Sequence, residues 1–219
     1  MTECLFCQIP TSRSSIEEHP ENVILLESSN FYVKPALGHF LEGYCLVVSK
    51  EHLRTMAELE LEGFAELKEV LREVRCRLSR LYGEELCTFE HGAACPSNRA
   101  GACIDHAHVH VLPTNCDVSE HLAAFQYRRL SALHDLRVFD EGPQSYIYYE
   151  PEPGQMMAYT CDERVPSQFM RRLICEQLGN KMAWDWRVAP YSNKIDDFLA
   201  KWTALFPTQR SEIPEYVPS

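Results

Sequence analysis

The stretch from Asp105 to Pro113 (DHAHVHVLP) carries a histidine at every second position. Successive side chains of a β-strand point to opposite faces, so an extended chain puts His106, His108 and His110 on one face and small or apolar residues on the other. The valines favour a strand, which Pro113 ends. Three imidazoles are costly to desolvate and contribute little to a core. We therefore expect a strand with a functional histidine face, in preference to a half-exposed strand that carries its histidines by chance.

Composition bounds the class of protein. The 219 residues are enough for one large domain, or for a core with a substantial extension, and 45% of them are hydrophobic. The formal charge of −11 argues against binding by bulk electrostatics, so we expect no nucleic acid and no membrane as partner. The sequence has no apolar run of about 18 residues and does not begin with a signal peptide. Ten cysteines, mostly scattered singly, predict reduced thiols and a cytoplasmic location.

A Cys-x-x-Cys pair, Cys4 and Cys7, lies close to the N-terminus. Such a pair chelates a soft metal ion or acts as a redox dithiol. A redox pair usually sits where a strand gives way to a helix, whereas this pair precedes Pro10 and a polar stretch. The position favours a metal knuckle, which supplies half of a tetrahedral site and needs two more ligands from elsewhere in the chain.

The first half of the chain alternates strand and helix patterns. Strands are predicted at 22–27, 31–35, 43–49 and 86–90. Thr55 and Glu58 have the spacing of a capping box and predict the start of a long helix, which Gly83 ends. Its apolar stripe consists of Phe64, Leu67, Val70, Leu71, Val74, Leu78 and Leu81. This helix is expected to form core scaffold.

The second half is less regular. We expect helices at 119–133, 166–178 and near 193–202, and strands at 146–149 and 156–160. Residues 1–140 are interpreted as the catalytic core and 141–219 as a C-terminal extension that packs on it. The extension either completes the core or a dimer interface, which the sequence favours, or covers the active site. In the second case Arg171, Arg172 or Arg187 would meet phosphates and a tryptophan would stack on a base.

Four separated motifs resemble the histidine-triad (HIT) superfamily of nucleotide hydrolases and transferases over about residues 4 to 113. They are the strand His106-x-His108-x-His110 with the Val-Leu-Pro that follows, the Cys4-Leu-Phe-Cys7 of zinc-containing members, the glycine-led segment 43–52 (GYCLVVSKEH), and the loop made of 89–94 (FEHGAA) and 101–106 (GACIDH). The loop is similar to that of the galactose-1-phosphate uridylyltransferase branch, with a longer insert. The resemblance implies an α+β fold, a HIT-like antiparallel β-sheet packed against one long helix, with a C-terminal α/β extension.

The resemblance also implies roles for individual residues. Cys4, Cys7, His52 and His106 match the positions that bind structural zinc, and two thiolates with two imidazoles suit that ion. His108 matches the nucleophile that attacks the α-phosphate and becomes a nucleotidyl-histidine. His110 matches a phosphate-contacting position.

The chain departs from the HIT pattern beside the first histidine. Many HIT hydrolases have a glutamine at the position of Ala102 and a hydroxyl residue at the position of Cys103, where it helps the leaving group. His91 and Asn98 are polar loop residues that are candidates to bind substrate with Cys103; the alternative is that they are ordinary turn residues.

We therefore expect a nucleotide hydrolase or nucleotidyltransferase with structural zinc, acting on a nucleotide or nucleotide derivative through His108. A homodimer is plausible from the resemblance. One alternative is a metal-dependent hydrolase in which His106, His108 and His110 hold a catalytic metal ion. Another is a nucleotide-binding protein without turnover, given Ala102 and Cys103.

Overall fold

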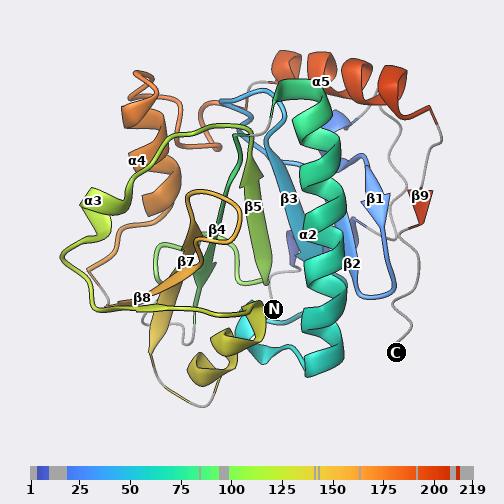
Figure 1. The fold of residues 1–219 in the computed structure, drawn as a ribbon. Coiled ribbons are helices and arrows are strands. Elements are labelled where there is room, and N and C mark those ends of the chain that lie inside the picture. The colour runs from blue at the N-terminus through green and yellow to red at the C-terminus, as the bar shows by residue number, and fades with distance from the viewer. Residues whose placement is uncertain are drawn as a thin grey trace.

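The computed structural model describes residues 4–9, 19–83, 85–93, 99–140, 142, 144–162, 164–190, 192–207 and 211–212. Within these residues, nine strands form one sheet in the order β6-β8-β7-β4-β5-β3-β2-β1-β9 (Figure 1). The strands are β1 Leu26–Glu27, β2 Phe31–Pro35, β3 Cys45–Ser49, β4 Cys87–Gly92, β5 His108–Leu112, β6 Tyr127–Arg129, β7 Ser145–Glu150, β8 Met157–Cys161 and β9 Ser211–Glu212. All neighbouring pairs are antiparallel except β1 and β9.

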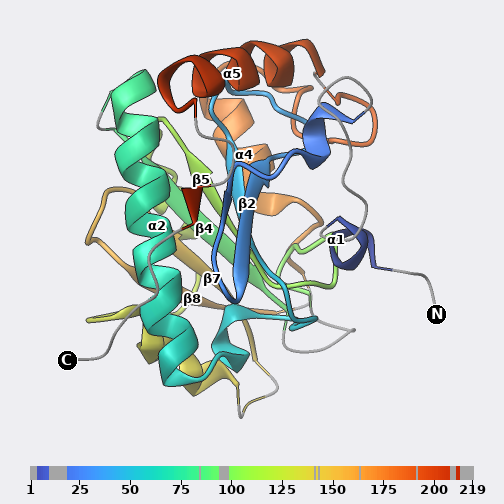
Figure 2. The ribbon, with the colours of Figure 1, turned by 90° about the vertical axis from the view of Figure 1, so that its right-hand side faces the viewer.

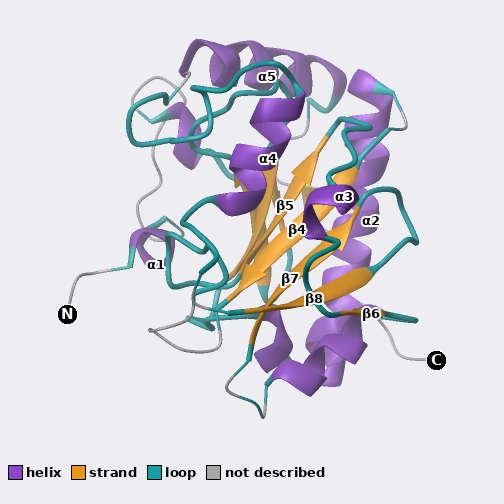
Figure 3. Cartoon of the chain, turned by 90° about the vertical axis from the view of Figure 1, so that its left-hand side faces the viewer, coloured by secondary structure: helices purple, strands orange, loops and turns teal. Residues whose placement is uncertain are grey.

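Helices cover both faces of this sheet. They are α1 Leu5–Gln8, α2 Leu61–Tyr82, α3 Ser119–Leu122, α4 Phe169–Gln177 and α5 Ser192–Leu205, with 3-10 helices η1 Pro20–Asn22, η2 Met56–Glu58 and η3 Leu133–Phe139. The long helix α2 lies on one face, and α1 and α4 lie on the other (Figures 2 and 3). Helix α5 crosses one end of the sheet (Figure 1). The predicted α+β fold, an antiparallel sheet packed against one long helix, is confirmed.

The register of the central strands decides which side chains share a face. Val47 of β3 pairs with Val33 of β2 and with Val109 of β5, and all three belong to the core beneath α2. Because side chains alternate, the neighbouring residues His108 and His110 point to the opposite face. The predicted separation of histidines from apolar residues along β5 is confirmed.

Helix α2 buries the apolar stripe that the sequence predicts, with Phe64, Leu67, Val70, Leu71, Val74 and Leu78 in the core and Leu81 packed against it. Gly83 follows the helix at a φ of +99°, a conformation that favours glycine. The start of the helix differs from the prediction. The Glu58 carboxylate accepts a hydrogen bond of 3.0 Å from the Thr55 amide and caps η2, while α2 begins only at Leu61.

Two other predictions were wrong. The strand expected at 22–27 is reduced to β1, because its first residues end the 3-10 helix η1. The helix expected at 119–133 stops after α3, and the chain continues into the edge strand β6. Strand β6 pairs with β8, and the backbone carbonyl of Gln126, just before β6, accepts a 2.8 Å hydrogen bond from the Thr160 amide. This pairing between distant segments overrides the local helix propensity.

The C-terminal third contributes to both the sheet and the histidine face. The strands predicted at 146–149 and 156–160 are confirmed as β7 and β8, and the two later helices as α4 and α5. Strands β4 and β7 are direct neighbours, so one sheet contains strands from both sides of residue 140. The division of the chain at residue 140 stays a prediction. No helix among the described residues is long and apolar enough to span a membrane.

Candidate functional site

The strand β5 and the segment before it carry the three histidines. His108 and His110 are in β5, while His106 precedes the strand. Backbone hydrogen bonds fix the segment that leads into β5: the Ala107 amide donates to the Leu53 carbonyl at 2.7 Å, and the Ser49 amide donates to the Ala107 carbonyl at 3.2 Å. All three imidazoles are at least 94% buried. The histidine row is therefore part of the interior, beneath α1 and α4, rather than a half-exposed strand.

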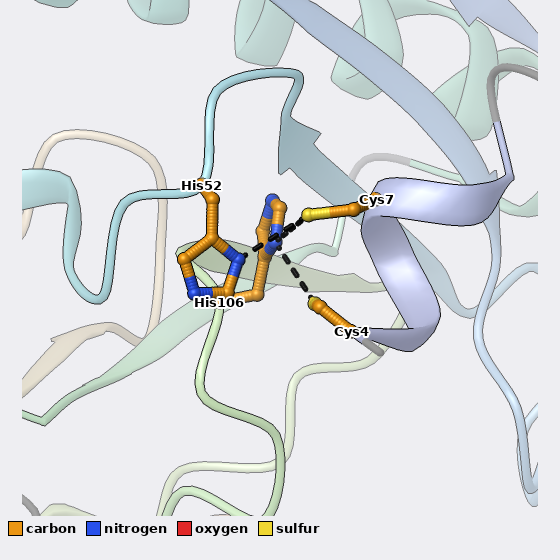
Figure 4. A group of neighbouring side chains, drawn as sticks. All are labelled: Cys4, Cys7, His52 and His106. Atoms are coloured by element: carbon orange, nitrogen blue, oxygen red, sulfur yellow. Dashed lines mark hydrogen bonds between the residues drawn. The ribbon is translucent and has the colours of Figure 1, made fainter. Parts of the chain in front are cut away.

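The Cys-x-x-Cys pair meets two histidines from distant parts of the chain (Figure 4). The ligand atoms of Cys4, Cys7, His52 and His106 all lie within 4.8 Å of one another. The Cys4 sulfur is 3.3 Å from Nδ1 of His106, and the Cys7 sulfur is 3.2 Å from Nδ1 of His52 and 3.6 Å from Nδ1 of His106. Among the described residues, this is the group of three or more His, Cys, Asp or Glu side chains that is placed to hold a metal ion.

These distances fit a tetrahedral zinc ion. Zn–S bonds of about 2.3 Å and Zn–N bonds of about 2.0 Å at a tetrahedral angle place sulfur and nitrogen roughly 3.5 Å apart. The opposite nitrogen of His106, Nε2, donates a hydrogen bond of 2.7 Å to the Ser49 carbonyl. That bond leaves Nδ1 unprotonated and facing the two thiols, which is the orientation a metal ligand requires. The donor set therefore fits a closed structural zinc site.

His108 is held in a single tautomer by the backbone. Its Nδ1–H donates a hydrogen bond of 2.6 Å to the carbonyl of His106. Burial lowers its pKa to about 4, with further contributions from neighbouring positive groups that include Lys34. The imidazole is therefore neutral at pH 7, and Nε2 carries a free lone pair, the form that a nucleophile needs.

His110 has the opposite arrangement. Its Nδ1 lies 2.6 Å from the Tyr44 hydroxyl, whose oxygen also accepts a hydrogen bond of 3.1 Å from Arg171. The Tyr44 O–H is then free to donate to Nδ1, so the proton of His110 is on Nε2. Within the described residues this buried Nε2 has no partner. Buried donors are normally satisfied, so an unpaired one beside a nucleophile suits an oxygen of a bound ligand.

A cavity of about 90 Å³ joins the two histidines. His108 and His110 line it together with Lys34, Cys103, Arg171 and Trp186, and residues of α1 and η1 contribute to its wall. The indole N–H of Trp186 donates a 3.3 Å hydrogen bond to the Cys103 sulfur. Cys103, a substrate-binding candidate in the sequence, therefore lies in the same pocket as the nucleophile candidate.

Arg171 of α4 fixes the C-terminal third over this pocket. Its guanidinium donates to the carbonyls of Trp184 at 2.9 Å and Gly38 at 2.8 Å, and to the Tyr44 hydroxyl. Gly38 adopts a φ of +65°, and a side chain at this position would collide with Trp186 and Arg171. Arg171 is therefore committed to the protein, and it acts on the pocket through its charge. The C-terminal third both completes the core and covers the pocket.

The other substrate-binding candidates lie in different surroundings. His91 is buried in β4, and its Nε2 accepts a 3.3 Å hydrogen bond from the Met170 amide at the start of α4. Burial lowers the pKa of His91 to about 3, so it remains neutral there. This contact positions α4 against the sheet. Asn98 lies outside the described residues.

Lys34 and Tyr44 were not predicted as site residues from the sequence. Both lie in segments predicted as strands; Lys34 belongs to none of the four motifs, and Tyr44 is part of the segment 43–52 but had no role assigned to it. A signal for Lys34 was available, because a charged residue inside the apolar strand Phe31–Pro35 points to a buried charge that needs a reason. Tyr44 offered no such signal, because a tyrosine next to a strand is ordinary core.

No protein-family model matches the chain, and no curated protein matches it. Among solved structures, a Hit-like protein from Bartonella henselae is 14% identical and has a TM-score of 0.43, covering 52% of this chain and 81% of its own. A HIT family protein from Bacillus subtilis is 18% identical, with a TM-score of 0.43, and the match covers 51% of this chain and 73% of that protein. A hypothetical histidine triad nucleotide-binding protein from Sulfolobus tokodaii is 22% identical, with a TM-score of 0.42, and the match covers 63% of this chain and 87% of that protein. Similarity at this level carries no information about activity.

Proposed function

We propose that this chain is a HIT-type nucleotide hydrolase or nucleotidyltransferase that acts through a covalent nucleotidyl-histidine on His108. The observation that carries the proposal is the 2.6 Å hydrogen bond from Nδ1 of His108 to the His106 carbonyl, which leaves Nε2 as the nucleophilic nitrogen in a pocket with an unpaired donor on His110. The four sequence motifs that resemble the HIT superfamily support the same assignment.

The reaction follows from these positions. The lone pair of Nε2 attacks the α-phosphorus, the bond from phosphorus to the leaving oxygen breaks, and that oxygen takes the electron pair. The Nε2–H of His110 donates to a phosphoryl oxygen and stabilises the charge that develops there. The imidazole of His108 becomes cationic, which strengthens its hydrogen bond to the His106 carbonyl. Water or a second phosphate then attacks phosphorus, and the electron pair of the P–N bond returns to Nε2.

We propose that Cys4, Cys7, His52 and His106 hold a structural zinc ion. When bound, zinc would link the N-terminal knuckle to β5 without contacting substrate. His106 connects the two sites, because its ring faces the thiols while its carbonyl orients His108. The zinc site therefore stabilises the position of the nucleophile.

Intact-protein mass spectrometry tests the nucleophile. The protein is incubated with dinucleoside polyphosphates, nucleoside phosphoramidates and nucleoside diphosphate sugars, and we expect an added nucleotidyl mass that His108→Ala abolishes. His121→Ala, which removes an exposed histidine of α3, is the matched control and should retain the adduct. Turnover that survives in His108→Ala, or no turnover with any compound, would contradict the proposal; the second result favours a nucleotide-binding protein.

Metal analysis tests the zinc site against the alternative of a catalytic ion on the three histidines. We expect one zinc per chain, lost in Cys4→Ser and retained in His108→Ala. Cys76→Ser removes an exposed thiol of α2 and should leave the metal content unchanged. A metal that stays in Cys4→Ser but is lost in His108→Ala would establish the alternative.

Several expectations remain proposals. We propose that His91, Asn98 and Cys103 contribute to substrate binding, that the chain forms a homodimer in the cytoplasm, and that it binds neither nucleic acid nor membrane. Of the three substrate-binding candidates, Cys103 has the most direct support, because it lines the pocket with His108.

A further inference from the structure

Lys34 is a buried cation that makes no hydrogen bond to any described residue. Its side chain, at 2% exposure, projects from the middle of β2. Among the described residues no carboxylate forms an ion pair with it, and the contact recorded for its ammonium is with the Phe6 ring, at 5.7 Å. Burying an unpaired charge is costly, so such a residue needs either a structural partner or a ligand. The described part of the chain offers no hydrogen-bonding or ion-pair partner.

The register places Lys34 on the histidine face. Lys34 pairs with Leu46 of β3, and Leu46 pairs with His110 of β5, so the three side chains form one row across three strands. Directly opposed residues of antiparallel strands project to the same face. Lys34 also lines the cavity that contains His108 and His110. Its ammonium is therefore directed into the proposed active site.

The charges around the cavity favour an anion. Lys34 and Arg171 bring positive charge to its lining, and Glu21 is the carboxylate there. Arg171 is committed to backbone carbonyls, whereas no residue in the described ranges accepts a hydrogen bond from the Lys34 ammonium. Burial lowers the pKa of Lys34 to about 8, while Glu21 acts to raise it, so the ammonium stays mostly charged at pH 7. A protein with a formal charge of −11 concentrates positive charge at this point.

We propose that Lys34 binds a second anionic group of the substrate, attached to the phosphoryl group that His108 attacks. The two free donors of the pocket, on Lys34 and on His110, come from strands that are separated by β3. Adjacent strands are about 4.8 Å apart, so these donors are suited to different groups of one ligand. The inference rests on the proposed function for the place of the attacked phosphoryl group. It selects substrates whose leaving group is a phosphate or a phosphorylated sugar over those that release an amine.

Binding of inorganic pyrophosphate and orthophosphate, measured by titration calorimetry on the zinc-loaded full chain, tests this inference. A charge-assisted hydrogen bond lost from a buried site lowers affinity by about ten- to a hundredfold. We expect Lys34→Gln to lower the affinity for pyrophosphate by that factor and the affinity for orthophosphate by less than about threefold. Lys68→Gln, which removes the same charge from an exposed site on α2, should change neither affinity. Equal losses for both anions, or no loss for pyrophosphate, would overturn the second-anion assignment.

Thermal unfolding of Lys34→Met separates a ligand-binding role from a structural one. If Lys34 binds the substrate, replacing an unpaired buried ammonium by a thioether of similar length raises the midpoint of unfolding of the free protein and abolishes its increase with pyrophosphate. A lower midpoint for the free variant would indicate a structural role and overturn the inference. Failure of the covalent trap on His108 together with Lys34-dependent pyrophosphate binding would refute the proposed chemistry and leave the anion site standing.

Discussion

The two faces of the sheet are both buried, but they differ in how their polar groups are satisfied. On the α2 face, Glu90 accepts hydrogen bonds of 2.7 Å from the Met56 amide and the Tyr146 hydroxyl. Glu150 on the same face is paired with Arg75 and accepts a further hydrogen bond from Tyr148. Nε of Arg75 has no partner among the residues that the structure describes, but the charge of the side chain is neutralised by Glu150.

On the histidine face, His110 and Lys34 bring polar groups to one cavity. Within the described residues Nε2 of His110 is buried without a partner, and the Lys34 ammonium makes no ion pair and lies 5.7 Å from the Phe6 ring; both side chains line the pocket with His108. Folding alone does not explain this arrangement, because unpaired buried donors destabilise the free protein. The α2 face is therefore built for stability, whereas the histidine face keeps groups that can bind a ligand and is less stable for it.

The largest expected effect separates activity from stability on the histidine face. His108→Ala should lower turnover by about 10⁴-fold or more, because it removes the nucleophile. The free energy of unfolding should change by no more than about 2 kcal/mol, since the variant loses one hydrogen bond and some ring packing. Turnover on the substrate found by mass spectrometry and urea denaturation measure the two quantities. A large loss of stability with little loss of turnover would reverse the assigned roles of the two faces.

His110 provides the second test, because a conservative replacement is available. His110→Leu removes the unpaired donor and should lower kcat by about 10²- to 10³-fold, the usual cost of one donor to a developing negative charge. His110→Gln keeps an N–H donor and should remain within about tenfold of the original enzyme. Steady-state kinetics on both variants measures the difference. Equal activity of the Leu and Gln variants would show that the donor is not used.

The α2 face should respond in the opposite way. Leu67 is fully buried against the sheet, so Leu67→Ala should lower the free energy of unfolding by about 2 to 5 kcal/mol through lost contacts and a cavity. Turnover per folded molecule at a temperature well below unfolding should stay within about twofold of the original protein. Chemical denaturation and kinetics on the same sample provide both numbers. A selective loss of kcat would mean that the two faces are energetically coupled.

The two faces also differ in how far the sequence predicts them. The apolar stripe of α2 and the alternation along β5 follow from periodicity, and both are confirmed. The cluster of Cys4, Cys7, His52 and His106 was predicted from a resemblance, and the structure brings these four residues together. Lys34 was missed, because its place beside His108 depends on pairing between strands that are far apart in the sequence. Local patterns define single elements, whereas the pocket depends on the register between them.

The smallest expected effect concerns Glu90, the buried carboxylate beneath α2. Burial raises its pKa to about 7 from an ordinary value of 4.5. The folded protein therefore binds more protons than the unfolded chain between these values, so this group's stabilising contribution is complete below about pH 4.5 and is lost as the pH rises to about 7. The loss amounts to at most roughly 3 kcal/mol.

Glu90→Gln isolates this contribution. The amide oxygen can still accept the hydrogen bond from the Met56 amide, and the amide NH2 can donate to the Tyr146 hydroxyl oxygen, but the side chain does not titrate. We expect the free energy of unfolding of the original protein, relative to that of the variant, to fall between pH 4.5 and 7, as measured by urea denaturation at a series of pH values. His108 lies on the other face, so the variant should retain the pH profile of turnover. A difference between the two proteins that is independent of pH would show that Glu90 is ionised throughout. The α2 face would then hold a stabilised charge, as Glu150 does, and the contrast with the unpaired Lys34 would be sharper still.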